Sequence, residues 1–281
     1  MWPTLLKIGS FEITTFGLMM FLGFAVAGIV LTRQFRRYGL HEDDASSIVL
    51  AGALGGIVGA KIYYAILYHD MSLLFTRAGL VWYGGFIGGV IACSILVIRK
   101  RIPYLTAADA TGPALAIGYA LGRVGCFLVG DDYGRPTESW VGIAFPRGAP
   151  PTTAANLRDF GAAVDPSIPG STVLRVFPTQ LFEVAAGVLI FTILLSMSKR
   201  PHVRGRIFGW FLLLAGLERL FIEIFRAKDD RFLGIFTVAQ LISVLVMAVG
   251  LALLSRRSGE LIAAVEPASL PPQRTRRRVK S

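Results

Sequence analysis

AADATGPALAIGYALGRVGCFLVG, residues Ala107–Gly130, is a run apolar enough to cross a bilayer, yet it holds Arg123. A second such run, IFGWFLLLAGLERLFIEIF at Ile207–Phe225, holds Arg219. An ionised group at membrane depth costs about 2.5–3.5 kcal/mol on insertion scales. Arginine stays charged, and its planar fork suits phosphate oxygens. The two arginines therefore indicate a membrane protein that binds a phosphate-bearing group within the bilayer.

The composition supports a membrane protein along most of the chain. The sequence is 54% hydrophobic and 17% charged, whereas a soluble domain has about 25% charged residues. Seven apolar stretches have the roughly 17–25 residues that a spanning helix needs. They lie at Ile13–Thr32, Ala45–Tyr68, Leu80–Ile98, Ala107–Gly130, Thr179–Met197, Ile207–Phe225 and Leu233–Ser255. We therefore expect an all-α polytopic protein with about seven transmembrane helices, in which residues 1–257 form one membrane domain.

The formal net charge of +11 is explained by topology better than by nucleic-acid binding. Most of the basic residues follow the first, third, fifth and seventh stretches, in alternating connections. The positive-inside rule places these connections in the cytoplasm, so we expect the N-terminus outside and the C-terminus inside. Membrane lipids, and no nucleic acid, are the expected partners of these charges.

Two segments lie outside the apolar stretches. Residues 131–177, between the fourth and fifth stretches, are expected to form a small external head that is irregular or partly β-structured. Residues 258–281 form a basic tail that contains prolines and is expected to be cytoplasmic and disordered. The sequence lacks a P-loop, a serine hydrolase motif and a metal-ligand spacing, so neither a cofactor nor a metal is expected.

Several polar residues accompany the two arginines. On a helix, Glu223 lies one turn beyond Arg219 on the same face, and Arg226 follows. Glu223 is expected either to neutralise Arg219 as an ion pair or to orient it toward an anion, and the two roles are compatible. Glu218 points away from this face by about 100°. Asp131 and its neighbour follow the stretch of Arg123, and could position it or cap a loop.

Several other candidates have a structural and a functional interpretation each. Tyr83 precedes Gly84 and Gly85, and its phenol belongs either to an interfacial aromatic belt or to a cavity. Glycines at four-residue spacing favour close helix packing. Gln180 and Glu183, at the start of the fifth stretch, and Gln240, inside the seventh, are each expected to make a helix–helix hydrogen bond or a site contact.

Four blocks of sequence together resemble the bacterial prolipoprotein diacylglyceryl transferase family. They are GRVGCFLVGD from Gly122, YGGFIG from Tyr83, PTQLFE from Pro178 and ERLFIEIFR from Glu218. The resemblance implies an enzyme of the bacterial inner membrane that transfers the diacylglyceryl group of phosphatidylglycerol. The acceptor would be the lipobox cysteine thiol in the signal peptide of a preprolipoprotein, the first step of lipoprotein maturation.

The resemblance also assigns roles to residues. It implies that Arg123 and Arg219 are the essential arginines, that Glu223 is the acidic partner, and that Tyr83 takes part in catalysis. Substrate binding would involve Glu223, Arg226, Asp131, Gln180, Gln240, Gly84 and Gly85.

The chain departs from the family pattern at five positions. The family's histidine before Gly-Gly is Tyr83, its two asparagines are Cys126 and Val129, its glutamate after glycine is Asp131, and its tyrosine in the first stretch is Phe16. A tyrosine of ordinary pKa, about 10, is a poor base at neutral pH. A phospholipid-binding paralogue that is not catalytic, or has another specificity, is therefore the alternative.

Overall fold

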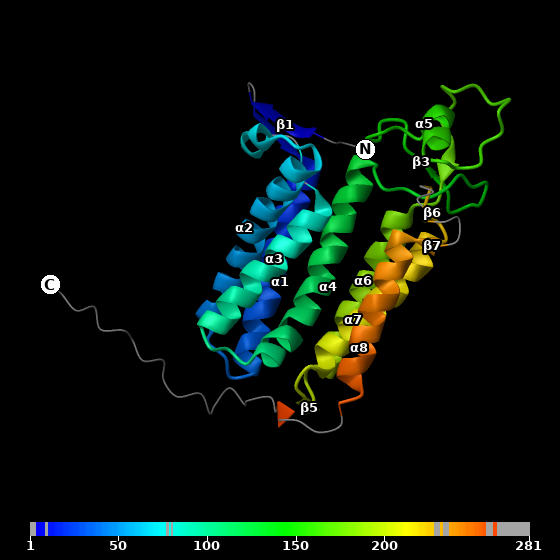
Figure 1. Cartoon of the computed structure of the whole chain (residues 1–281). Helices are drawn as coiled ribbons and strands as arrows, with labels where there is room; N and C mark the ends of the chain where they lie inside the picture. Colours follow the sequence, from blue (N-terminus) through cyan, green and yellow to red (C-terminus); the bar gives the residue numbers. More distant parts are fainter. Residues whose placement is uncertain are drawn as a thin grey trace.

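The computed structural model describes residues 4–8, 11–76, 79, 81–227, 231–232, 236–256 and 261–262. This part of the chain contains seven long helices that run side by side as a bundle (Figure 1). They are α1 (Thr15–Arg37), α2 (Glu42–Leu67), α3 (Trp82–Arg99), α4 (Tyr104–Val129), α6 (Thr179–Met197), α7 (Arg206–Glu223) and α8 (Val238–Leu254). The short strands and the remaining helices collect at the two ends of the bundle.

The helices confirm a polytopic, mostly helical protein with five candidate membrane spans. Helices α1, α2, α3, α4 and α6 are long and apolar enough to cross a membrane. The sixth and seventh predicted stretches form α7 and α8, which fall short by the same measure. Helix α7 carries four charged side chains, and α8 has 17 residues. Leu80 and Leu233, the predicted starts of two stretches, lie outside the described residues.

One end of the bundle carries most of the irregular structure (Figure 1). The segment between α4 and α6 forms a small head with a core of Tyr133, Phe145, Leu157 and Val176, joined by Ala227. The elements at this end are β1 (Thr4–Ile8), β2 (Phe11–Thr14), the 3-10 helix η1 (Met71–Phe75), β3 (Ile143–Ala144), α5 (Ala154–Asp159), β4 (Arg175–Val176), β6 (Arg231–Phe232) and β7 (Phe236–Thr237). Strand β1 pairs with β2, β3 with β4, and β6 with β7, all antiparallel.

The opposite end holds a two-stranded sheet formed by β5 (His202–Val203) and β8 (Leu261–Ile262). Strand β8 lies within the predicted disordered tail, so the structure differs from that expectation at these two residues. The physical reason is that Ile262 is buried in the apolar core between α1, α2, α3 and α4. The other residues of the tail, 258–260 and 263–281, lie outside the described residues.

Helices α2 and α3 touch through backbone, because glycines line both sides of their contact. A Cβ atom on Gly55 would lie 2.7 Å from the carbonyl oxygen of Gly88, and one on Gly59 would lie 2.8 Å from the Cα atom of Gly88. Gly84 would meet the backbone of Gly59 in the same way. Contacts this short exclude any side chain, which confirms the close-packing interpretation of the glycine spacing. Gly84 and Gly85 therefore have a structural role on the face toward α2.

Helices α4 and α7 are fastened together near their N-terminal ends by a buried carboxylate. Asp109 of α4 accepts hydrogen bonds from the backbone N–H groups of Gly205 (2.7 Å) and Phe208 (2.8 Å). Gly205 adopts a φ of +88°, a conformation that suits glycine, as the chain turns into α7. Asp109 thus supplies from another helix the acceptor that the first turn of α7 needs.

Candidate functional site

Arg123 lies in the last two turns of α4, where it contacts carboxylates from two other segments. Its Nη1 atom donates to Oδ2 of Asp132 at 2.7 Å, and its Nη2 atom lies 3.1 Å from Oε1 of Glu183. The guanidinium also lies over the ring of Tyr119, 5.2 Å from the ring centroid, a favourable cation–π contact. Glu183 is 1% exposed. The buried carboxylate and the aromatic ring together compensate the charge of Arg123 inside the bundle.

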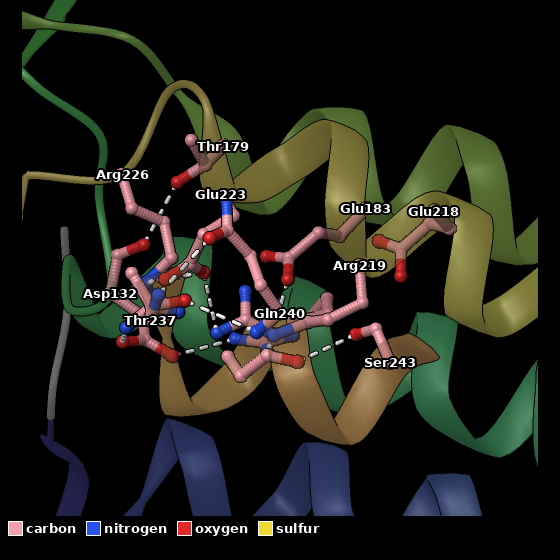
Figure 2. Close-up of polar contacts among 12 residues, drawn as sticks. Asp132, Thr179, Glu183, Glu218, Arg219, Glu223, Arg226, Thr237, Gln240 and Ser243 are labelled. Carbon is pink, nitrogen blue, oxygen red and sulfur yellow. Dashed lines mark hydrogen bonds and ion pairs between the residues drawn. The ribbon is translucent and has the colours of Figure 1, made fainter. Parts of the chain in front are cut away.

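Arg219 and Arg226 form a second half of the same network (Figure 2). Nη2 of Arg219 lies 2.8 Å from Oε2 of Glu223, which confirms the predicted pair one turn apart on α7. Nη2 of Arg226 donates to Oδ1 of Asp132 at 3.0 Å, and Nε of Arg226 lies 3.9 Å from Oε2 of Glu223. Asp132 therefore bridges Arg123 and Arg226. The structure brings all three arginines into one cluster of charges.

Tyr119 joins one further carboxylate, that of Glu218, to this cluster through Glu183. Its hydroxyl oxygen lies 2.8 Å from Oε1 of Glu183 and 3.3 Å from Oε1 of Glu218. Tyr119 comes from α4, Glu183 from α6 and Glu218 from α7. The offset of about 100° between Glu218 and the face of Arg219 directs Glu218 toward α4, where it meets Tyr119, a contact that the sequence did not predict.

The cluster keeps one strong donor without a partner. Among the described residues, Nη1 of Arg219 is buried and makes no hydrogen bond. An unpaired polar group inside a protein is costly, and a guanidinium fork binds phosphate oxygens well. The site can therefore bind an anionic phosphate group, because Arg219 has a free N–H to donate.

Outside the helices, two neighbouring aspartates have opposite electrostatic surroundings. Burial alone would raise the pKa of Asp132, but the guanidiniums of Arg226 and Arg123 outweigh it and hold the pKa below its usual value. Burial raises the pKa of Asp131, whose Oδ1 atom has no partner among the described residues. Of the two aspartates that the sequence offered, Asp132 is thus the one that forms ion pairs with Arg123 and Arg226.

Three other predicted site residues make their contacts with groups other than the arginines. Tyr83 is 42% exposed, and its ring packs edge-on against Trp82 at 5.3 Å. Gln180 is buried and donates to the backbone oxygen of Asp131, so it supports the loop. Gln240 completes a capping box with Thr237 at the start of α8. Neither contact is the predicted helix–helix hydrogen bond, because Gln180 bonds to a loop and Gln240 to the start of its own helix.

Sequence reasoning missed Tyr119 as a site residue and gave no role to Asp109. A tyrosine in an apolar helix carries no signal by itself, although its place one turn before Arg123 puts it on the same face. Glu183 was easier to identify from the sequence than Tyr119, because the sequence placed this carboxylate at the start of a spanning helix. A buried ionisable residue in such a helix is a functional candidate by default.

Comparison with known proteins gives this site a family. The family model described as prolipoprotein diacylglyceryl transferase matches residues 3–256. A Geobacter sulfurreducens protein named phosphatidylglycerol–prolipoprotein diacylglyceryl transferase is 30% identical over 272 residues, which cover 91% of this chain and 96% of that protein. A relative of the same name from Nitrosomonas europaea is 30% identical over 90% of this chain and 88% of the relative. Another, from Clostridium tetani, is 27% identical over 89% of this chain and 96% of the relative. The chain belongs to the prolipoprotein diacylglyceryl transferase family.

Proposed function

We propose that this protein transfers the diacylglyceryl group of phosphatidylglycerol to the thiol of a cysteine in prolipoproteins. The names of the relatives state this activity for those proteins. The observation that carries the proposal to this chain is the cluster of Arg123, Arg219 and Arg226, with Nη1 of Arg219 unpartnered among the described residues. A phosphodiester is the type of group that such a cluster binds.

The reaction follows from the chemistry of the two substrates. The cysteine sulfur attacks the glycerol carbon that carries the phosphate, so a C–S bond forms while the C–O bond breaks. The bonding electron pair goes to the phosphate oxygen, and glycerol-1-phosphate leaves. Arg123 and Arg219 stabilise the charge that develops on this phosphate, because fixed donors in a site of low dielectric act strongly on developing charge. Glu223 orients Arg219 through the 2.8 Å ion pair.

The proposal includes a placement in the bacterial plasma membrane. Helices α7 and α8 would cross the bilayer with the five candidate spans, which gives seven crossings. The head and the arginine cluster would then lie at the periplasmic end, and β5 at the cytoplasmic end. The basic residues in the last turns of α1 and α3 and just after α3, α6 and α8 support this orientation, because positive residues concentrate on the cytoplasmic side.

The test combines purified protein, phosphatidylglycerol vesicles and a lipobox peptide with one cysteine. We expect the peptide to gain the mass of one diacylglyceryl group, and a peptide with serine in place of cysteine to remain unmodified. Binding of phosphatidylglycerol without product, under conditions where the Geobacter relative is active, would instead support the phospholipid-binding alternative. Tyr83→Phe adds a separate test, because unchanged kinetics would remove the phenol from the mechanism.

A further inference from the structure

Glu218, Tyr119 and Glu183 form a continuous row of oxygen atoms that ends at Arg123. The hydroxyl oxygen of Tyr119 lies within 3.3 Å of Glu218 and 2.8 Å of Glu183, and Glu183 lies 3.1 Å from Nη2 of Arg123. Glu183 is 1% exposed, whereas Glu218 is partly exposed. The row therefore has one accessible end, at Glu218, and one buried end, at the guanidinium.

Hydrogen-bond chemistry indicates which of these three side chains carry a proton. A phenol has a single O–H, so Tyr119 can donate to only one of the two carboxylates. Glu183 lies closer to the hydroxyl and is the acceptor. An ionised Glu218 would then face the phenol oxygen with two lone pairs opposed, so Glu218 must carry a proton and donate it to Tyr119.

A count of charges leads to the same assignment. The cluster holds the three guanidiniums of Arg123, Arg219 and Arg226. It also holds four carboxylates, from Asp132, Glu183, Glu218 and Glu223. Full ionisation would leave an excess negative charge beside the proposed phosphate site, whereas a protonated Glu218 makes the cluster neutral.

Building on the proposed function, we propose that Glu218, Tyr119 and Glu183 are a proton relay that accepts the proton of the acceptor thiol. The thiol proton moves to Glu218 as the proton of Glu218 moves to the oxygen of Tyr119. The proton of Tyr119 moves to Glu183 in the same step. The sulfur, now a thiolate, forms the C–S bond, and the proton held by Glu183 returns along the row to the departing phosphate.

The relay couples the two halves of the reaction. Glu183 loses its negative charge when it takes the proton, so Arg123 loses one of its two carboxylate partners. The cluster then carries one more positive charge at the moment when the phosphate gains negative charge. Arg123 becomes available to the leaving group because the nucleophile has been deprotonated.

The charged groups around the relay come from four segments: α4, the loop after it, α7 and the loop after α7. Arg123 on α4 contacts Glu183 directly, and Asp132 in the following loop contacts Arg123. On α7, Arg219 adjoins Glu218 in sequence, and Glu223 pairs with Arg219. In the loop after α7, Arg226 pairs with Asp132. Within the part of the chain that the structure describes, each of these groups except Glu218 forms an ion pair, which leaves Glu218 as the group able to exchange a proton.

Two conservative substitutions test the relay in the full-length protein. Glu218→Gln keeps an N–H that can donate to Tyr119 but cannot take up a proton. Tyr119→Phe removes the hydroxyl and keeps the ring beneath Arg123. At pH 7 we expect each to lower kcat for diacylglyceryl transfer by about 10²-fold or more, the usual contribution of general acid–base catalysis. At pH 9 a thiol with a pKa of about 8.5 ionises by itself, so the ratio of wild-type to variant kcat should fall markedly.

Matched controls are available on the same chain. Tyr104→Phe removes a phenol from the other end of α4, where it contacts Ser94, and Glu138→Gln replaces an exposed carboxylate of the head. Both should retain wild-type kcat at either pH. The relay is refuted if Glu218→Gln or Tyr119→Phe keeps kcat within twofold, or if the deficit is the same at pH 7 and pH 9. Loss of binding to phosphatidylglycerol vesicles with unchanged kcat would also refute it. If the wild-type protein itself gives no product, the proposed function fails, and the relay fails with it.

Discussion

Asp109→Asn is the substitution whose consequence can be worked out most directly from the structure. Asp109 is fully buried and accepts two backbone hydrogen bonds at the start of α7, from Gly205 and Phe208. An asparagine retains a single acceptor oxygen, so one bond is lost and the other loses its charge. Hydrogen bonds to charged groups contribute about 1.5–3 kcal/mol each, against about 0.5–1.5 kcal/mol for neutral ones. The free energy of unfolding should therefore fall by about 2–4 kcal/mol.

The expected result is a lower melting temperature, measured by tryptophan fluorescence in phospholipid nanodiscs. For a chain of this size each kcal/mol corresponds to about 2–4 °C, so Tm should fall by about 5–15 °C. Asp159→Asn makes the same chemical change at an exposed position of α5 and should leave Tm unchanged. Equal Tm values for the two variants, within 2 °C, would show that Asp109 does not fasten α7 to α4.

Loss of this fastening should also reduce turnover. Arg123 lies 14 residues beyond Asp109 on α4, and Arg219 lies 14 residues beyond Gly205 on α7. At 1.5 Å per residue both separations are about 21 Å along the helix axes, and the two helices run in the same direction (Figure 1). A small shift of α7 along its axis would move Arg219 to a different height in the bundle from Arg123. Because catalysis is sensitive to displacements near 1 Å, we expect kcat to fall by about tenfold.

Three further results are expected. Gly88→Ala should lower Tm by several degrees because its Cβ would overlap the backbone of α2, whereas Gly28→Ala, with only Val49 at 3.7 Å, should leave Tm unchanged. Asp132→Asn should lower Tm at neutral pH. The pKa of Asp132 is depressed, so this difference should hold down to about pH 4 and vanish as the pH falls through the folded-state pKa; equal Tm values for the two proteins at neutral pH would contradict the ion pairs. Arg219→Lys keeps the charge but loses the fork, and should lower kcat/KM for transfer by about tenfold or more; wild-type kinetics would show that a point charge is sufficient.

The sequence predicted the helical membrane fold and the arginines because both are local signals. Length and apolarity identify a membrane helix without any knowledge of its neighbours, and an arginine within one is conspicuous. The pair of Arg219 and Glu223 was equally local, since four residues separate them on one helix face. Each of these features requires only the chain's own periodicity.

Contacts between helices could not be predicted in the same way. Whether Glu218 reaches Tyr119 depends on how α7 is rotated and displaced relative to α4, and no pattern within either helix encodes that rotation. The same applies to Asp109, whose partners lie 96 and 99 residues away. Family position also suggested a catalytic role for Tyr83, whose ring is exposed beside Trp82, and that role stays a prediction that Tyr83→Phe tests.

The glycine contact between α2 and α3 has a mechanical consequence. Side chains can change rotamer and so let two helices slide, but a contact made of backbone atoms has no rotamers to change. The helix pair α2–α3 is therefore expected to move as one rigid body, because its contact is made by Gly55, Gly59, Gly84 and Gly88. An apolar cavity of about 380 Å³ lies along one side of this helix pair, and its lining includes Gly89 and Cys93 of α3 and Ala108 and Thr111 of α4. We therefore expect any widening of the bundle that admits a lipid to occur along contacts such as that between α3 and α4, and not between α2 and α3.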